Sequence, residues 1–304
     1  MSLDISNLFG VKGRVAVVTG GSSGVGLMIA KGLVINGCKV YIVALPSEPI
    51  GTVVKDLNAL ASTTENGGSA TGYACDLSSK PEITELSSYI SKEENGKLDI
   101  LISNAGIRRD PPIECNVLTA DLAELQESMF SRPEEDFSDT FQINTTAHYY
   151  LAVSFLPLLA AASQAPLSGC GSEGETGADE GRGVMLITSS CASMHNVTNV
   201  DLTSYAASKA ATDHLVKLLA AKFGRWYIRV VGINPGFVPS NMNPVGAEGN
   251  MFAGLFDKVP AKRPGRAEDL AGTVLYLVSK AGAYVDGISL CVDGGRVLVA
   301  NGQE

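Results

Sequence analysis

The sequence has few residues that could bind a metal or form a disulfide framework. Only three histidines occur among 304 residues, and they stand apart from one another. The six cysteines are scattered, and no two of them form a Cys-x-x-Cys pair. A structural zinc site needs closely spaced ligands, and scattered thiols are usual in reducing compartments. We therefore expect a cytoplasmic protein without a metal site.

Basic clusters and long apolar runs are also missing. The formal net charge is −9, with no block rich in Lys or Arg. Nucleic acids and anionic membranes bind basic surfaces, so the sequence predicts neither as a partner. Residues 1–13 lack the apolar centre of a signal peptide, and no uninterrupted apolar run is long enough to span a membrane. The 45% of hydrophobic residues instead predicts a globular protein with a large core.

The first pattern that is present is a strand, a glycine-rich turn and a helix. Residues 14–19 form a short apolar run, residues 20–26 are rich in glycine, and a helical pattern follows over 27–35. Such glycines let the backbone approach a pyrophosphate, and free N–H groups at the start of the helix can bind it. The pattern predicts a nucleotide-binding βαβ unit, and the alternative is an ordinary flexible loop.

Apolar strands alternate with helical stretches along the rest of the chain. Strands are expected at residues 39–45, 69–75, 97–102, 183–188, 227–233 and 288–292, and helices at 51–61, 81–92, 120–129, 134–162, 205–219 and 268–279. This alternation predicts one α/β domain over residues 1–304, a doubly wound parallel sheet of the Rossmann type with helices on both faces. Residues 163–182 are rich in Gly, Ser and acidic residues, so we expect a flexible surface insertion there.

Tyr205 and Lys209 are the first candidates for chemistry. They lie four residues apart in an alanine-rich segment without Gly or Pro, so both side chains leave one face of a helix. A nearby ammonium favours the phenolate, and we expect Lys209 to lower the pKa of Tyr205. Such a phenol can exchange a proton with a carbonyl or alcohol oxygen. The alternative is an aromatic anchor beside a solvated lysine.

In combination these motifs resemble the short-chain dehydrogenase/reductase family over nearly the whole chain. Thr19-Gly20-x-x-x-Gly24-x-Gly26 is similar to the family's cofactor loop, and the order of elements looks most like the 3-oxoacyl-carrier-protein reductase-like branch. The resemblance implies an NAD(P)-dependent oxidoreductase. It would transfer a hydride between the nicotinamide and the carbon of a carbonyl or secondary alcohol, most often in the direction of ketone reduction.

The resemblance also implies four catalytic residues, because Asn144, Ser190, Tyr205 and Lys209 match the family's tetrad in order. Tyr205 would be the acid or base on the substrate oxygen, and Lys209 would hold the nicotinamide ribose. Ser190 would hydrogen-bond the substrate oxygen, and Asn144 would anchor a water that relays the proton. Ser190 lies two residues further from Tyr205 than is usual in the family, so Ser189 is the competing serine.

The implied cofactor site follows the ends of several strands. Asp76 stands where the family places a side chain near the adenine, and Pro235-Gly236 resembles the loop that holds the nicotinamide carboxamide. The complete set of cofactor-binding residues implied by the resemblance is Gly20, Ser22, Ser23, Gly24, Val25, Gly26, Asp76, Leu77, Asn104, Ala105, Gly106, Tyr205, Lys209, Pro235, Gly236, Val238 and Ser240.

The end of the second strand bears on the choice between NADP(H) and NAD(H). NAD sites commonly hold the ribose 2′-hydroxyl with an acid there, but this position is Ala44 and the next acid is Glu48. Hydroxyls of Ser22, Ser23 and Ser47 could donate hydrogen bonds to a 2′-phosphate. We therefore expect a modest preference for NADP(H), with NAD(H) usable.

The substrate and the assembly are less sharply indicated. The segments expected to line the substrate pocket favour a small, hydrophobic or acyl carbonyl compound, and they contain Arg108, Arg109, Phe237, Met242, Met251, Phe252, Leu255 and Phe256. We expect a homodimer or homotetramer that pairs the helices at 134–162 and 205–223. Two alternatives of other classes are a non-catalytic dinucleotide-binding sensor or scaffold and a dehydratase or epimerase of the same fold.

Overall fold

A single parallel sheet of seven strands organises the computed structural model, which describes residues 3–110, 115–167, 174–194, 196, 202–243, 256 and 259–300. The strand order is β3-β2-β1-β4-β5-β6-β7, and every neighbouring pair is parallel. This confirms the predicted doubly wound α/β fold. The strands are β1 (Val15–Thr19), β2 (Lys39–Ala44), β3 (Ser69–Ala74), β4 (Ile100–Ser103), β5 (Val184–Thr188), β6 (Arg229–Pro235) and β7 (Ser289–Val292).

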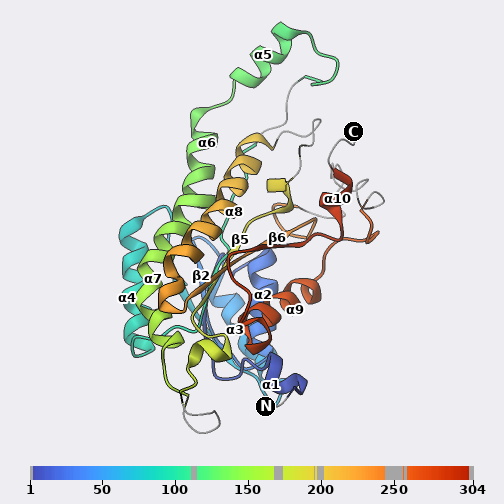
Figure 1. Cartoon of the computed structure of the whole chain (residues 1–304). Coiled ribbons are helices and arrows are strands. Elements are labelled where there is room, and N and C mark those ends of the chain that lie inside the picture. Colours follow the sequence, from blue (N-terminus) through green and yellow to red (C-terminus); the bar gives the residue numbers. More distant parts are fainter. Residues whose placement is uncertain are drawn as a thin grey trace.

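Helices cover both faces of this sheet (Figure 1). On one face lie α2 (Gly24–Ile35), α3 (Ile50–Ala61) and α9 (Ala267–Val278), and on the other lie α4 (Lys80–Glu93), α7 (Ala147–Ser163) and α8 (Thr203–Phe223). Successive strand residues point to opposite faces, so Ala16 and Val18 pack into one apolar cluster and Val17 packs into the other. The buried runs of the central strands therefore follow from a sheet covered on both sides.

The long helix expected at 134–162 is built from three consecutive pieces. These are α6 (Glu134–Phe141), a π-helical turn η1 (Gln142–Thr146) and α7, which continues through Pro157. In the described part of the chain, the helix Glu134–Ser163 is the one long and apolar enough to cross a membrane by length and composition. Its fully buried Leu151, Phe155 and Leu159 pack in the core, which accounts for that apolar character. The short α5 (Leu122–Phe130) projects away from the body (Figure 1).

Several boundaries differ from the expected ones. β6 begins at Arg229 rather than at 227, because Tyr227 has a φ of 58° that a strand cannot accommodate. β4 begins at Ile100 rather than at 97, and Asp99 just before it accepts a hydrogen bond from the Val15 N–H. The sequence analysis did not predict the short helices α1 (Ile5–Phe9) and α10 (Arg296–Ala300).

Residues 174–182 belong to the segment expected to be a flexible insertion, and here the structure differs from the expectation. Gly177–Glu180 forms a 3₁₀ turn that begins with a capping box between Thr176 and Asp179. Gly177 is buried, and Arg182 pairs with Asp99 at 2.7 Å. The composition indicated correctly that little apolar surface would be buried. It gave no sign that backbone carbonyls of this segment would bind buried guanidinium groups.

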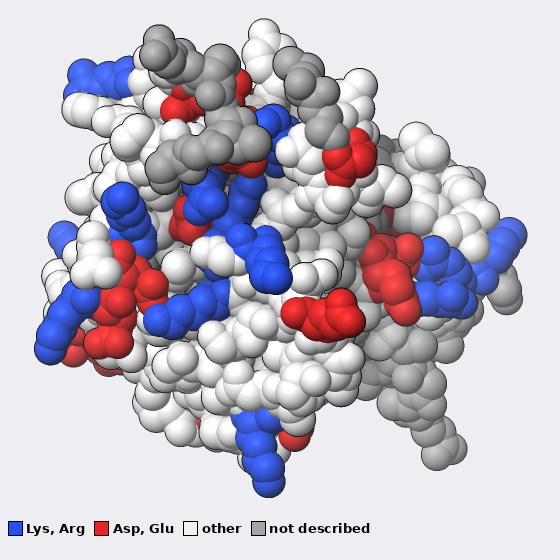
Figure 2. Space-filling model, turned by 90° about the horizontal axis from the view of Figure 1, so that it is seen from below, with Lys and Arg blue, Asp and Glu red and all other residues white. Residues whose placement is uncertain are grey.

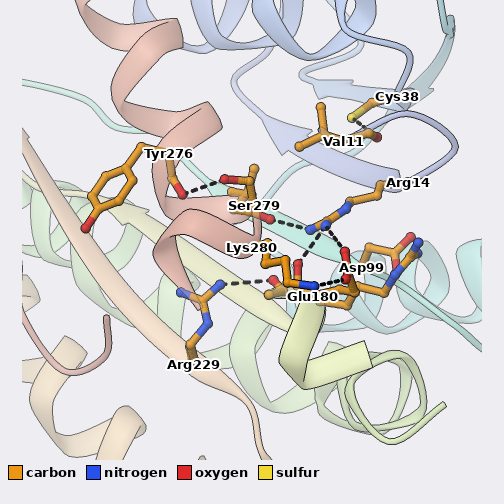
Figure 3. A network of polar contacts seen from close by, with 12 residues as sticks. Val11, Arg14, Cys38, Asp99, Glu180, Arg229, Tyr276, Ser279 and Lys280 are labelled. Carbon is orange, nitrogen blue, oxygen red and sulfur yellow. Dashed lines mark hydrogen bonds and ion pairs between the residues drawn. The ribbon is translucent and has the colours of Figure 1, made fainter. Parts of the chain in front are cut away.

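Those guanidinium groups form a polar network at the edge where the strands begin (Figure 3). Arg14 is 2% exposed and donates to the carbonyls of Val278 at 2.5 Å and Glu180 at 2.6 Å. Arg229 donates four hydrogen bonds through Nη1 and Nη2, to the carbonyls of Gly181, Leu277, Gly282 and Val285. Burial lowers the pKa of each arginine to about 10, so both stay charged near neutral pH. The network joins β1, β6, residues 180–181 and the end of α9.

The surface around this network carries both signs of charge. Figure 2 shows the face below the sheet in the view of Figure 1, where basic and acidic side chains lie next to one another. Ion pairs near the strand starts include Lys39 with Glu94 at 2.6 Å and Lys280 with Glu180 at 2.7 Å. These pairs are partly exposed to solvent, and ion pairs at a protein surface are worth about 1 kcal/mol or less each. The buried arginine contacts therefore do more to fasten this edge.

Candidate active site

A cavity of about 880 Å³ opens at the opposite edge, where the strands end. It is lined by the segments that follow β1 to β6 and by the start of α8. Ligands of doubly wound sheets bind beyond the carboxyl ends of the strands, so this is the expected place for a site. Every residue predicted to be catalytic or to bind the cofactor lines this cavity, except Asn144 and Gly26.

The glycine turn after β1 has the geometry of a phosphate cradle. Gly20 and Gly24 have φ values of 62° and 51°, which favour glycine over residues with a side chain. A Cβ on Gly26 would lie 2.2 Å from the Gly20 carbonyl oxygen, so only glycine fits beneath the turn. α2 begins at Gly24, three residues earlier than expected. Its first N–H groups therefore lie in the turn that lines the cavity, where they can bind a pyrophosphate.

A hydrogen-bonded brace holds this turn against the end of β4. Thr19 Oγ1 accepts from the backbone N–H groups of Asn104 at 2.9 Å and Ala105 at 3.2 Å. The Asn104 side chain donates back to the Thr19 carbonyl at 3.1 Å. Gly106 is next in the chain, and a Cβ there would lie 3.3 Å from Lys209 Nζ. Asn104, Ala105 and Gly106 thus form the floor between the cradle and the α8 residues.

At the far end of the cavity, Ala44 and Asp76 line the wall as predicted. The Asp76 carboxylate accepts from the Ser78 N–H at 2.8 Å. Glu48 also lines this end, and Ser22 Oγ donates to its carboxylate at 3.4 Å. In the sequence, Glu48 is the first acidic residue after Ala44, which occupies the position where NAD sites commonly have an acid. The turn after β2 instead brings this carboxylate to the cavity beside the glycine cradle.

Tyr205 and Lys209 line the cavity together from the first turns of α8. Lys209 Nζ lies 5.8 Å from the centre of the Tyr205 ring. Lys209 is 2% exposed, and its ammonium donates to the Thr188 carbonyl at 2.8 Å. Burial lowers the pKa of Lys209 to about 8, and Asp213 opposes this shift. The predicted pair on one helix face is therefore present.

The predicted direction of the pKa of Tyr205 is wrong for this structure. The pKa of the phenol is raised to about 12, mainly by burial, and Cys191 and Asp110 contribute in the same direction. A hydrogen bond with Ser190 and the charge of Arg108 act in the opposite direction. The spacing in the sequence located the ammonium correctly, but it could not show that loss of solvent around the phenol outweighs nearby positive charge.

The two candidate serines face different partners. Ser190 hydrogen-bonds with Tyr205, whereas Ser189 Oγ donates to the Lys209 carbonyl at 3.0 Å inside the core. The turn that carries Ser190 is braced from below, because Asn234 Nδ2 donates to the Ser190 carbonyl at 3.2 Å. The same Asn234 amide donates to the Asp213 carboxylate at 2.9 Å. Geometry thus favours Ser190 over Ser189 as the serine that can reach a substrate oxygen.

Asn144 is completely buried in the π-helical turn and does not line the cavity. Its Oδ1 accepts from the Ile107 N–H at 2.9 Å. Its Nδ2 donates to the Ile107 carbonyl at 2.9 Å and to Ser208 Oγ at 3.0 Å. Both amide hydrogens are therefore used, and a water bound by this side chain could only donate to Oδ1. Asn144 holds the segment after β4 against α8.

Only some of the residues expected to line the substrate end of the cavity are found there. Arg108, Arg109, Phe237 and Met242 line the cavity. The Phe256 ring packs edge-on against the Phe237 ring, with 6.1 Å between the ring centres. Met251, Phe252 and Leu255 lie outside the described residues. The Arg109 side chain is 56% exposed, and its guanidinium pairs with the Asp139 carboxylate at 3.7 Å, so it is largely solvated.

Asp110 is a site residue that the sequence analysis missed. Its side chain is fully buried and accepts hydrogen bonds from the N–H groups of Ser204 at 3.1 Å and Tyr205 at 3.2 Å. It also accepts from Ser204 Oγ at 2.7 Å and pairs with Arg132 at 3.0 Å. The N-cap position of α8 itself is Leu202, which has no capping side chain. Asp110 therefore caps the helix that carries Tyr205 from 94 positions away in the sequence.

Asp110→Ala should lower the free energy of unfolding by about 3 kcal/mol, because it removes a buried carboxylate that pairs with Arg132 and caps α8. Urea denaturation measures this. The matched control is Asp121→Ala, which removes the exposed cap of α5, where Asp121 accepts from the N–H groups of Ala123 and Glu124. The control substitution should lower the free energy of unfolding by about 1 kcal/mol or less. If both variants lose the same free energy of unfolding, Asp110 is no more important to the fold than an exposed helix cap.

Comparisons with known proteins agree with this geometry. The family model described as short chain dehydrogenase matches residues 14–249. The short-chain dehydrogenase/reductase PhomF of Diaporthe leptostromiformis is 34% identical over 315 residues, which cover 98% of this chain and 96% of the relative.

Solved structures are similar over nearly the full length. The Pseudomonas aeruginosa RhlG/NADP active-site complex has a TM-score of 0.75 and 27% identity, covering 96% of this chain and 99% of that chain. A 7α-hydroxysteroid dehydrogenase complexed with NADH and 7-oxo glycochenodeoxycholic acid has a TM-score of 0.76 and 27% identity, covering 96% of this chain and 98% of that chain. With the glycine cradle and the Tyr205–Lys209 pair in place, the protein belongs to the short-chain dehydrogenase family and is an NAD(P)-dependent dehydrogenase or reductase.

Proposed function

We propose that the protein reduces a ketone to a secondary alcohol and that Tyr205 donates the proton. The observation that carries this proposal is the Tyr205 phenol beside the buried Lys209 ammonium, with Nζ 5.8 Å from the ring centre, in a cavity that also holds Ser190 and extends to the glycine cradle. Burial raises the pKa of this phenol, so it stays protonated near pH 7 and holds the proton that reduction of a carbonyl needs.

The proposed reaction balances as a hydride and a proton added across the C=O bond. The reduced nicotinamide supplies the hydride to the carbonyl carbon when it is bound. Tyr205 Oη gives its proton to the carbonyl oxygen, which becomes the alcohol hydroxyl. Ser190 Oγ hydrogen-bonds the same oxygen while negative charge develops on it. Lys209 stabilises the tyrosinate that remains until a proton from solvent restores the phenol.

Asn144 completes the proposed tetrad by a supporting role. It fixes Ile107 and Ser208, and Ser208 lies one residue before Lys209 on α8. We keep a proton-relaying water at Asn144 in the proposal, and this water would donate a hydrogen bond to Oδ1, because both amide hydrogens are already used. The 3-oxoacyl-carrier-protein reductase-like branch also stays a proposal, supported by the order of motifs along the chain.

A panel of ketones with NADPH or NADH tests the proposed activity through the loss of reduced-cofactor absorbance. Turnover of any ketone supports it. Tight binding of the dinucleotide without turnover would instead favour the sensor or scaffold. Conversion of a substrate without net consumption of cofactor would favour a dehydratase or epimerase.

For the cofactor we propose a modest preference for NADP(H), with NAD(H) usable. Ala44 supplies no acid at the end of β2, and the hydroxyl of Ser22 lies at this end of the cavity. Glu48 keeps the preference small, because its carboxylate repels a 2′-phosphate and can accept from a 2′-hydroxyl. The relatives in solved complexes include one with NADP and one with NADH.

Two substitutions should move this preference in opposite directions. Ala44→Asp should shift the ratio of kcat/KM for NADPH over NADH toward NADH by about tenfold, because it adds an acceptor for the 2′-hydroxyl and repels the phosphate. Glu48→Gln should raise the same ratio by a similar factor, because it removes a negative charge. If neither variant changes the ratio, the ribose is held elsewhere and this cofactor assignment is wrong.

We also propose a homodimer or homotetramer that pairs α7 and α8 across a two-fold axis. Apolar side chains on these helices remain exposed, with Tyr149 at 44%, Val153 at 43% and Leu218 at 45%. Exposed apolar groups on neighbouring elements are typical of subunit interfaces. Light scattering at micromolar concentration should give at least twice the chain mass, and a monomer would overturn the proposal.

A further inference from the structure

Arg296 is a buried arginine that lines the active-site cavity, and its guanidinium donates no hydrogen bond to any residue that the structure describes. It is 5% exposed and lies at the start of α10, directly after Gly294 and Gly295 in the turn that follows β7. Its guanidinium carbon lies 5.4 Å from the centre of the Phe237 ring, and its Nε is buried without a hydrogen-bond partner. Among the residues that the structure describes, no carbonyl or carboxylate accepts a hydrogen bond from it.

The other buried arginines show how unusual this is within the molecule. Arg14 and Arg229 donate hydrogen bonds from both Nη1 and Nη2 to backbone carbonyls, and Figure 3 shows some of these contacts. Such contacts repay the cost of removing a charge from water. The ring of Phe237 repays only part of that cost, because a cation–π contact leaves the N–H donors of the guanidinium without acceptors. Arg296 thus retains donors for a ligand.

The charged and titratable groups around Arg296 do not neutralise it. Asp293 uses its carboxylate oxygens on the N–H groups of Gly295 at 3.0 Å and Val297 at 2.7 Å, and it forms no ion pair with Arg296 in the described part of the chain. Burial raises the pKa of the Cys191 thiol to about 12, so it carries no charge. Cys191 follows Ser190 directly, so this unpaired cation lies on the Ser190 side of the cavity.

We propose that Arg296 binds a carboxylate of the substrate, so that the ketone reduced at Tyr205 belongs to the class of keto acids. A guanidinium offers parallel N–H donors that match the two oxygens of a carboxylate. The chain as a whole has a net charge of −9 and repels anions at long range, so an acidic substrate needs a local cation. This inference rests on the proposed ketone reduction and specifies its substrate.

The test compares an aryl ketone that carries a carboxylate with its methyl ester. Wild-type protein should prefer the acid. Arg296→Gln should raise KM for the acid by about tenfold to a hundredfold, because a charge-assisted contact is lost, and should change kcat/KM for the ester less than about twofold. Arg296→Lys should keep part of the preference. The control is Arg225→Gln, which removes the same charge from an exposed position beyond the end of α8. It should leave kcat/KM unchanged for both the acid and the ester.

Each other outcome has a definite meaning. Equal losses for acid and ester in both Arg296 variants, with a lowered melting temperature, would show a structural role and overturn the inference. A weaker Kd for the dinucleotide with the acid preference intact would assign Arg296 to a cofactor phosphate and would also overturn it. If wild-type protein reduces neither ketone, the proposed function fails, and calorimetric binding of the acid to wild type but not to Arg296→Gln still decides the role of Arg296.

Discussion

Tyr205→Phe should lose nearly all ketone reduction, with kcat reduced by at least about 10²- to 10⁴-fold, because the ring stays and only the proton donor is removed. The Kd of the dinucleotide should change less than about twofold, since the glycine cradle and the brace between Thr19 and Asn104 are untouched. Steady-state kinetics at saturating substrate measures the first value, and fluorescence titration measures the second. A variant that keeps most of the wild-type kcat would disprove the role of Tyr205.

The pH dependence gives an independent check on the same residue. With its pKa raised to about 12, Tyr205 stays protonated through the neutral range, so it should not limit reduction there. Oxidation of the alcohol needs the tyrosinate, and its rate should rise steadily as the pH increases toward that value. Ser190→Ala removes a hydrogen bond that lowers the pKa of Tyr205, and it should move the oxidation profile to higher pH.

Lys209→Met should lower both kcat and the affinity for the dinucleotide, each by about tenfold or more, because the ammonium is proposed to stabilise the tyrosinate and to bind the ribose. Folding should respond differently. The ammonium is buried with a pKa of about 8, below the unfolded value of 10.5, so its charged form is disfavoured in the folded protein. The variant should therefore be no less stable than wild type at pH 7.

The sign of this linkage can be measured directly. Between pH 8 and pH 10.5 the unfolded chain binds more protons at Lys209 than the folded chain does, so wild-type stability should gain from rising pH in that window. Lys209→Met should lack this gain. Urea unfolding at pH 7 and pH 9.5 compares the two proteins, and a variant that is much less stable at pH 7 would show that the Lys209–Thr188 contact outweighs the cost of burial.

The sequence predicted the elements whose signals are local. β1 and β5 are apolar runs buried on both faces, and the glycine turn after β1 needs the backbone angles that Gly20 and Gly24 have. Tyr205 and Lys209 share a helix face because their spacing alone places them there. These features depend on a few consecutive residues, so the chain could be interpreted before its fold was known.

Other features depend on residues that only the fold brings together. Asp110 and Ser204 are 94 positions apart, and nothing near Asp110 marks it as the cap of another helix. Arg296 lies in a short helix that periodicity could not detect. The role proposed for it depends on a buried Nε without a hydrogen-bond partner among the described residues, which the sequence does not show. The pKa of Tyr205 was predicted in the wrong direction because it depends on burial, which spacing does not report.

The buried network of Arg14 and Arg229 has a practical consequence for redesign. It fastens the edge where the strands begin, whereas Tyr205, Arg296 and the glycine cradle all lie at the edge where they end. The segment between β6 and α9 accepts none of these guanidinium hydrogen bonds, so exchanging it for that of a relative such as PhomF would leave the network in place. The scaffold and its specificity are separable parts that a protein engineer can recombine.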